Sequence, residues 1–291
     1  ASIAVLTTTG AAKSVTTPVP ALLKTDRGLE FRAWLPADFT SRHGDVPLIL
    51  FSHGFGGCSE QSRTLTQALA NAGYAVLAPN HRDEGCSRFR GGLRGALQAG
   101  HLRPEQPFTD PAAWTADTER SRRDDIQALL TFALSHAPYK DAIDPGRIAL
   151  MGHSLGGYTA LGLAGGWESW HDPRFKCVLA LSPYIAPFVV QGRMGALGVP
   201  VMYQTGTRDI GIGPILLKRG GYDRTGTING VRKYLVELKG AGHFAWTELN
   251  PVYQKTIADY AISFFDRELR GLPAPLLDAA PVAQVAQYRH S

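Results

Sequence analysis

Cysteine is scarce in this sequence, with three residues in a chain of 291: Cys58, Cys86 and Cys177. So few cysteines exclude a framework of several disulfides, and their spacing matches no metal-binding motif. We expect buried free thiols. The alternative is a single bridge between Cys58 and Cys86, because each comes just after one of two adjacent expected strands.

Long apolar runs are also missing, because Pro, Gly or a charged residue interrupts each candidate within a few positions. This excludes a membrane-spanning helix, so we expect a soluble protein without a membrane span. The chain begins at Ala1, and no charged and then apolar signal segment is visible. We therefore expect either a cytoplasmic protein or an exported one whose signal has already been removed.

The sequence contains no internal repeat and no linker long enough to separate domains. We therefore expect residues 1–291 to form a single domain with its core at about 28–270. Residues 83–116 are interpreted as an insertion over the active-site edge, because they are rich in Gly, Arg and Pro and show no period. Residues 271–291 are expected to form a C-terminal tail, packed or loose. The sequence does not indicate the oligomeric state.

Neither sign of charge dominates strongly: Lys and Arg number 30 against 25 Asp and Glu, a formal net charge of +5. The basic residues are spread along the chain, and no zinc-finger, RNA-binding or helix-turn-helix pattern accompanies them, so no nucleic-acid partner is expected. The densest basic stretch lies within the expected insertion. We interpret it as a solvated surface, with an anionic substrate as the alternative. Its members are Arg88, Arg90, Arg94 and Arg103.

Short apolar runs alternate with longer helical patterns from residue 28 onward, which predicts an α/β fold with a mostly parallel sheet and helices on both faces. Strands are expected at 29–36 (an antiparallel edge strand), 47–53, 74–82, 147–151, 177–183, 200–206 and 232–240. Helices are expected at 59–73, with Ser59 as N-cap, at 117–136 and at 251–270.

Ser154 lies in "LMGHSLGGYTA", two positions after Gly152 and two before Gly156. Gly-x-Ser-x-Gly alone is weak evidence, since about one chain in ten of this length would contain it by chance. Its context is stronger, because an apolar strand precedes the serine and a small-residue helix follows it. A serine in such a strained turn projects its hydroxyl from the sheet edge, and the glycines avoid collisions with neighbouring backbone. We therefore expect Ser154 to be a nucleophile; a plain glycine-rich turn is the alternative.

Two further residues at strand ends complete the pattern. His243 follows the last expected strand on a glycine-rich loop, and Asp209 comes just past an earlier strand. Since the carboxyl ends of parallel strands meet at one edge, we expect His243 to take the proton of Ser154 and Asp209 to orient the imidazole. Asp223 is the rival for the acid, whereas Asp172 is expected at the wrong edge.

Two backbone N–H groups are expected to stabilise an oxyanion: that of Leu155, after the nucleophile, and that of Phe55, in "SHGFGG". His53 in the same loop is expected to orient it by hydrogen bonding, and a buried ion pair between Arg82 and Asp83 is expected to brace it.

Residues near the expected site edge are candidates for substrate binding, with ordinary packing as the alternative for the aromatic ones. They are Phe55, His153, Tyr184 and Trp246, together with Phe108 and Trp114 in or beside the insertion.

Four segments together resemble the α/β-hydrolase superfamily over about residues 29–270: "LILFSHGFGG", "LANAGYAVLAPNHRDEG", "IALMGHSLGGYTA" and "GAGHFAW". Within it, the chain resembles the dienelactone-hydrolase-like and platelet-activating-factor-acetylhydrolase-like esterases, which include cutinase-like polyester hydrolases. The resemblance implies hydrolysis of carboxylic esters by Ser154, Asp209 and His243, with Phe55 and Leu155 as the oxyanion hole.

Several departures and alternatives accompany this resemblance. Dienelactone hydrolases proper carry a cysteine in place of Ser154, so a lactone-specific role is not expected. Residues 183–200 are too few for a large lid domain, so we expect an open cleft that takes short-chain or aromatic esters, or polyesters. No metal or organic cofactor is required, because the expected residues already supply proton transfer and oxyanion stabilisation. A peptidase, a perhydrolase and a non-catalytic binding module are the alternatives.

Overall fold

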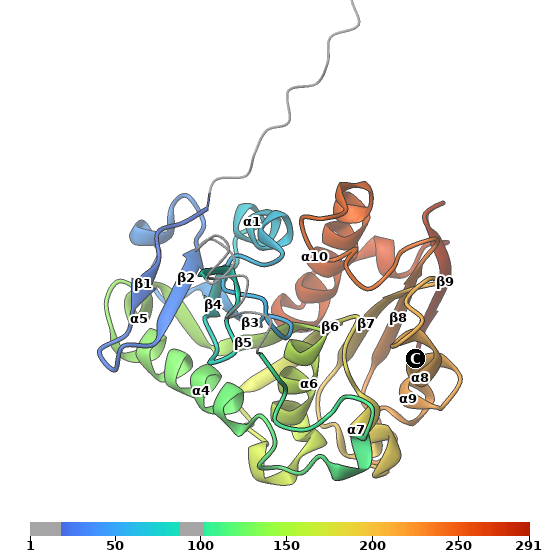
Figure 1. Cartoon of the computed structure of the whole chain (residues 1–291). Helices are drawn as coiled ribbons and strands as arrows, with labels where there is room; N and C mark the ends of the chain where they lie inside the picture. The colour runs from blue at the N-terminus through green and yellow to red at the C-terminus, as the bar shows by residue number, and fades with distance from the viewer. Residues whose placement is uncertain (1–18, 88–101) are drawn as a thin grey trace, which may run out of the picture.

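One nine-stranded sheet organises the computed structural model, which describes residues 19–87 and 102–291 (Figure 1). The strand order is β1-β2-β4-β3-β5-β6-β7-β8-β9. The bounds are β1 Leu23–Lys24, β2 Glu30–Trp34, β3 Val46–Ser52, β4 Ala75–Pro79, β5 Ile143–His153, β6 Phe175–Leu181, β7 Val201–Gly206, β8 Lys233–Leu238 and β9 Val285–His290. The pairings from β4 to β8 are parallel and those at both edges antiparallel, which confirms the expected mostly parallel sheet.

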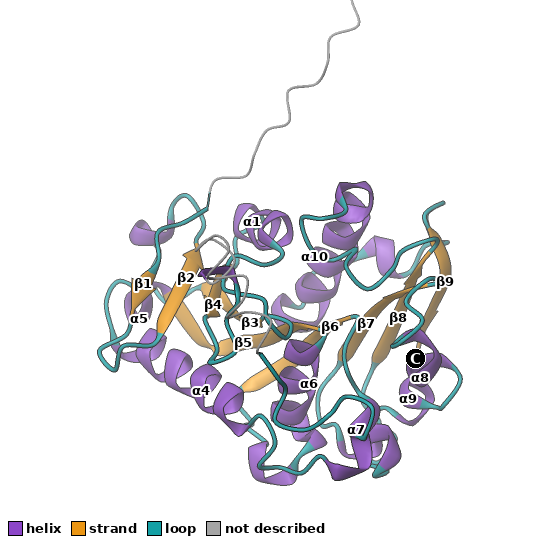
Figure 2. Ribbon diagram, in the orientation of Figure 1, coloured by secondary structure: helices purple, strands orange, loops and turns teal. Residues whose placement is uncertain are grey.

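Helices cover both faces of the sheet, as Figure 2 shows. The helices are α1 Arg63–Asn71, α4 Arg120–Ser135, α5 Tyr139–Ala142, α6 Leu155–Leu161, α7 Ala186–Val190, α8 Gly213–Leu217, α9 Gly221–Arg224 and α10 Gln254–Arg270. Short 3₁₀ turns lie at Phe39–Ser41, Pro111–Ala113, Glu168–Trp170, Met194–Ala196, Pro251–Tyr253 and Pro275–Leu277, and a π-helical turn at Gly162–Gly166. No helix in the described ranges is long and apolar enough to cross a membrane.

Strand β3 shows why the core has two halves. All seven of its residues are buried, and alternate side chains point to opposite faces. Leu48 and Leu50 pack with helices α4 and α6, while Ile49 and Phe51 pack with α1 and α10. A strand buried on both faces appears in the sequence as a continuous apolar run. The carboxyl end of β3 therefore emerges at the sheet edge from a rigid, fully packed strand.

Two expected elements differ from the structure. Helix α1 begins at Arg63, not after Ser59, whose N–H donates to the side-chain oxygen of Asn80 at 2.8 Å. Strand β2 is antiparallel as expected, but β1 lies outside it at the edge. The C-terminal tail is packed, because β9 adds an antiparallel strand beside β8. Of the expected basic stretch, Arg88, Arg90 and Arg94 lie outside the described residues.

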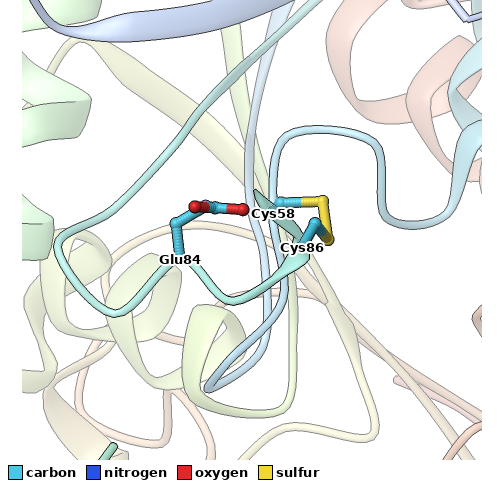
Figure 3. A group of neighbouring side chains, drawn as sticks. All are labelled: Cys58, Glu84 and Cys86. Atoms are coloured by element: carbon cyan, nitrogen blue, oxygen red, sulfur yellow. A yellow bond between two sulfur atoms is a disulfide. The ribbon is translucent and has the colours of Figure 1, made fainter. Parts of the chain in front are cut away.

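The expectation of free thiols is wrong for two of the three cysteines. Cys58 and Cys86 form a disulfide with a Cα–Cα distance of 5.8 Å, whereas Cys177 is free and buried. The two cysteines follow β3 and β4, which are parallel neighbours, so their loops leave the same edge of the sheet. Glu84 lies beside the bridge (Figure 3), and its carboxylate accepts hydrogen bonds from Ser87. The bonded sulfurs offer no thiolate, so this group is not a metal site.

Removing the bridge should lower stability, because it closes a loop between residues 28 positions apart. The double variant Cys58→Ser/Cys86→Ser is expected to lose about 3–4 kcal/mol in free energy of unfolding, since the unfolded chain regains the entropy of the open loop. Urea titration of both proteins measures this loss. Wild type treated with dithiothreitol is the control, and an unchanged unfolding midpoint in the variant would contradict the expectation.

Candidate active site

The turn at Ser154 has the strained geometry that its flanking glycines predict. Ser154 lies between β5 and α6 with φ 54° and ψ −116°, a backbone conformation that residues other than glycine rarely adopt. A Cβ on Gly156 would lie 1.9 Å from the carbonyl oxygen of Ser52, and one on Gly152 would lie 2.1 Å from that of Gly156. Only glycine therefore allows helix α6 to start this close to β3 and β5.

Ser154, His243 and Asp209 lie together at the carboxyl edge of the sheet. The hydroxyl oxygen of Ser154 is 2.9 Å from Nε2 of His243, in the loop after β8. Nδ1 of His243 is 3.3 Å from Oδ1 of Asp209, which follows β7 and is 3% exposed. The two other candidate acids lie elsewhere: Asp223 pairs with an arginine of β9, and Asp172 pairs with an arginine two residues along the chain.

Ser182 is a member of this cluster that the sequence analysis missed. Its hydroxyl oxygen lies 2.5 Å from Oδ2 of Asp209 and 2.7 Å from Nδ1 of His243. The residue directly follows β6 and is fully buried. The available signal was its position, since it is a polar residue after an apolar strand that ends at the same edge as β5 and β7.

The loop of residues 53–57 packs against the serine turn. A Cβ on Gly54 would lie 3.4 Å from Cβ of Ser154. Within the described residues, no acceptor occupies the backbone N–H of Phe55 or that of Leu155. The two N–H groups that the sequence predicts as oxyanion donors are therefore both available to donate to a ligand.

A buried arginine holds this loop in place. Arg122 of α4 is fully buried, and its guanidinium donates to the carbonyl oxygens of His53 at 2.7 Å and Gly54 at 3.3 Å. It also donates to the carboxylate of Asp83 at 2.9 Å, and the same carboxylate oxygen accepts the N–H of Gly56 at 3.0 Å. The backbone groups on both sides of Phe55 are thus bound to one ion pair.

This arrangement corrects the expected ion pair between Arg82 and Asp83. Arg82 is largely exposed and pairs with Glu105 at 3.0 Å, while Asp83 turns inward to Arg122. Burial alone would raise the pKa of Asp83, but the charge and hydrogen bonds of Arg122, together with the neighbouring His53 and His81, outweigh burial and hold that pKa well below its ordinary value. Asp83 therefore remains a carboxylate that can accept from both Arg122 and Gly56.

The two histidines beside the loop and the turn have supporting contacts. Nδ1 of His53 lies 2.7 Å from the carbonyl oxygen of Gly54, and its Nε2 accepts the N–H of His81, as expected of a residue that orients the loop. Nε2 of His153 lies 2.9 Å from the carbonyl oxygen of His243. Burial lowers the pKa of His153 to about 3, so it stays neutral and adds no positive charge beside His243.

A second Ser–His–Asp chain lies under the loop. The hydroxyl of Ser52 is 2.9 Å from Nε2 of His81, whose Nδ1 is 2.8 Å from Oδ2 of Asp125. Ser52 is 1% exposed and His81 2%, so no substrate carbonyl can reach this hydroxyl. Hydrogen-bond geometry therefore does not distinguish this Ser–His–Asp set from the set of Ser154, His243 and Asp209. Access from solvent does distinguish them.

Asp125 gives the fold a dependence on pH. Burial raises its pKa to about 7, so the folded protein keeps a proton that the unfolded chain loses near pH 4. The resulting stability is complete below about pH 4 and is lost as the pH rises through about 7. Asp125→Asn cannot ionise, so its melting temperature is expected to exceed that of wild type at pH 8 and to approach it at pH 4.

Melting curves of both proteins at pH 4, 6 and 8 measure this difference. Asp124→Asn is the matched control, because Asp124 is about half exposed and pairs with Arg123 on the surface. A gap between Asp125→Asn and wild type that stays constant across this range would contradict the expectation.

A cavity of about 920 Å³ opens over Ser154 and His243. The sequence candidates Phe55, His153 and Tyr184 line it, and so do Phe108 and Thr109 of the expected insertion. Trp246 does not line it: its indole is 1% exposed, packs in the core and donates to the side chain of Gln204, so its expected substrate role is wrong. The other apolar lining residues are Ile210, Ile212, Ile215, Phe244 and Leu249.

Comparison with known proteins gives the same architecture. A family model described as alpha/beta hydrolase fold matches residues 47–194. The chain is 25% identical to "Platelet-activating factor acetylhydrolase" of Cavia porcellus over 48% of this chain and 36% of that protein. It is 29% identical to "Cutinase 2" of Thermobifida cellulosilytica over 54% of this chain and 56% of that protein. These matches thus span between about a third and about half of the relatives' lengths.

Proposed function

Because the chain belongs to the alpha/beta hydrolase fold family, we propose that it hydrolyses carboxylic esters, with Ser154 as nucleophile, His243 as general base and Asp209 as the orienting acid. One observation carries this proposal: the Ser154 hydroxyl lies 2.9 Å from Nε2 of His243 at the base of a mainly apolar cavity. A neutral serine is a poor nucleophile, and an imidazole at hydrogen-bond distance supplies the base it needs.

The reaction follows from the placement of these groups. Ser154 Oγ attacks the ester carbonyl carbon while its proton passes to Nε2 of His243. The N–H groups of Phe55 and Leu155, which have no other acceptor among the described residues, donate hydrogen bonds to the negatively charged former carbonyl oxygen. His243 then gives its proton to the leaving alcohol, and an acyl-enzyme remains on Ser154. Water, deprotonated by His243, releases the acid and restores the serine.

The cavity supports substrates with a compact apolar or aromatic acyl group. The rings of Phe55 and Phe108 lie 5.8 Å apart, and those of Phe108 and Tyr184 lie 5.0 Å apart, so three aromatic residues form one side of it. Such surfaces bind apolar groups mainly by removing them from water. We therefore propose short-chain and aromatic esters as the preferred soluble substrates.

The rim of the cavity supports polyesters as a second substrate class. Ile210 is 86% exposed, Phe244 58% and Leu249 79%, and all three line the cavity. Exposed apolar side chains around an active-site opening favour contact with an apolar solid. A cutinase is among the relatives, which agrees with this proposal. Release of soluble products from an aromatic polyester film tests it, and an intact film would contradict it.

A graded series of p-nitrophenyl esters, from acetate to palmitate, tests the proposed activity. We expect fast hydrolysis of the short esters and a fall in kcat/KM as the acyl chain outgrows the cavity. A fluorophosphonate probe should label Ser154, as peptide mass spectrometry can establish. If no ester is hydrolysed and Ser154 is not labelled, the proposal is wrong and a binding function without catalysis takes its place.

A further inference from the structure

Ser182 lies between the acid and the base of the proposed triad. Its hydroxyl oxygen is 2.5 Å from Oδ2 of Asp209 and 2.7 Å from Nδ1 of His243, whereas Asp209 and His243 are 3.3 Å apart at their nearest pair. A hydrogen bond between an imidazolium and a carboxylate ordinarily spans about 2.7–2.9 Å. The shorter hydrogen bonds to Asp209 and His243 are therefore those of the Ser182 hydroxyl, which connects the two residues.

The number of protons fixes the direction of these hydrogen bonds. Nε2 of His243 must be free to accept the proton of Ser154, so Nδ1 carries the ring proton. That proton can be donated to the Ser182 oxygen, and the single Ser182 hydroxyl proton is then donated to Asp209. The reverse arrangement would place the ring proton on Nε2, where it would block the proton transfer from Ser154.

Backbone hydrogen bonds fix the position of Ser182 beside the serine turn. Its φ is 42°, in the left-handed region, and its N–H donates to the carbonyl oxygen of Gln204 at 2.7 Å. Nearby residues of the same segment hold the nucleophile, because the carbonyl oxygen of Leu181 accepts the N–H of Ser154 and the N–H of Tyr184 donates to the Ser154 carbonyl oxygen. The segment that holds Ser154 therefore also presents the Ser182 hydroxyl to His243.

We propose that Ser182 is a positioning residue for ester hydrolysis, which relays the negative charge of Asp209 to His243 and selects the reactive tautomer. This inference rests on the proposed function. When His243 takes the proton of Ser154, the imidazolium Nδ1–H remains bonded to Ser182 Oγ and the Ser182 O–H remains bonded to Asp209. Ser182 keeps its proton and Asp209 gains none; their hydrogen bonds strengthen as the ring becomes charged.

Ser182→Ala and Ser182→Gly test the relay as a matched pair. A hydrogen bond to a charged group contributes enough that each variant should lose about 10- to 100-fold in kcat with little change in KM. Glycine accepts a φ of 42° without strain, so a backbone role would leave the glycine variant near wild type. Equal losses in the two variants support the hydroxyl, and recovery in the glycine variant overturns the proposal.

Thr205→Val is the control for loss of a neighbouring hydroxyl, because Thr205 Oγ1 lies 3.4 Å from the same oxygen of Asp209 and is not bonded to His243. We expect it to lose less activity than Ser182→Ala. Thermal unfolding of each variant establishes that it is folded before kinetics are compared.

A double-mutant cycle with Asp209→Ala separates the relay from a packing role. If Ser182 acts through Asp209, its replacement should cost less than about threefold in a protein that already lacks the carboxylate. Full additivity of the two losses would overturn the proposal. The two proposals fail differently: an inactive wild type contradicts ester hydrolysis, whereas an active wild type with unimpaired Ser182→Ala contradicts only the relay.

Discussion

Replacing Ser154 with alanine is expected to lower kcat for p-nitrophenyl butyrate by about 10⁵- to 10⁶-fold, as loss of a catalytic serine does when it removes the whole covalent path. The oxyanion donors and the cavity would remain, so a small residual rate above that of water is expected. The measurement is steady-state hydrolysis by wild type and variant, prepared in parallel, with burst kinetics to detect the acyl-enzyme. Equal rates in the two proteins would contradict the assignment of Ser154.

Two further variants make this result specific. Ser154→Gly should be as inactive as Ser154→Ala but more stable, because glycine adopts a φ of 54° without strain. Ser52→Ala removes the serine of the buried Ser–His–Asp chain, and Ser154 should still react with the fluorophosphonate. Loss of labelling in both Ser52→Ala and Ser154→Ala, with Ser52→Ala still folded, would contradict the view that access from the cavity decides between the two serines.

Replacing Arg122 with methionine is expected to reduce kcat by up to about 100-fold, although Arg122 does not contact the cavity. The guanidinium binds the carbonyl groups of His53 and Gly54, so without it the N–H of Phe55 should lose its fixed direction. A misdirected oxyanion donor costs nearly as much as an absent one. The same variant should lose about 3–5 kcal/mol of stability, because Asp83 would keep a buried, unpaired charge.

Kinetics and urea unfolding of Arg122→Met measure the two losses, and two variants separate them. Arg122→Met/Asp83→Asn removes the unpaired charge, so stability should recover in part while kcat stays low. Arg120→Met is the matched control, since Arg120 lies two residues before Arg122 on the same helix and is about half exposed. An unchanged kcat in a folded Arg122→Met would show that the loop keeps its shape without the ion pair.

The sheet and the edge that carries the site could be predicted because both leave local signals. Buried parallel strands such as β3 and β6 appear as apolar runs, and their carboxyl ends must meet at one edge. Ser154, Asp209 and His243 each follow such a run, and the glycines around Ser154 report a close backbone approach. These inferences require only an approximate strand order. Errors of a few residues in where a strand or helix ends therefore do not affect them.

Two missed features, Arg122 and Ser182, depend on partners that are distant in the sequence. Arg122 is one of several charged residues in "RSRRDD", and nothing local separates it from its exposed neighbours; its partner Asp83 is 39 residues away. Ser182 has no motif of its own, because its role comes from strands on either side of it. For Trp246 the sequence predicts the wrong environment, because residue spacing in an irregular loop does not fix which way a side chain points.

The ion pair of Arg122 and Asp83 and the bridge between Cys58 and Cys86 bind the loop of residues 53–57 from two sides. The conformational entropy of that loop is therefore lost when the chain folds, not when a substrate arrives. In the proposed reaction its amide dipoles would need little reorganisation as charge develops on the ester oxygen, which is the condition under which preorganised donors lower a barrier most. Binding energy from the acyl group of the proposed ester substrate would then be left for holding that substrate in place.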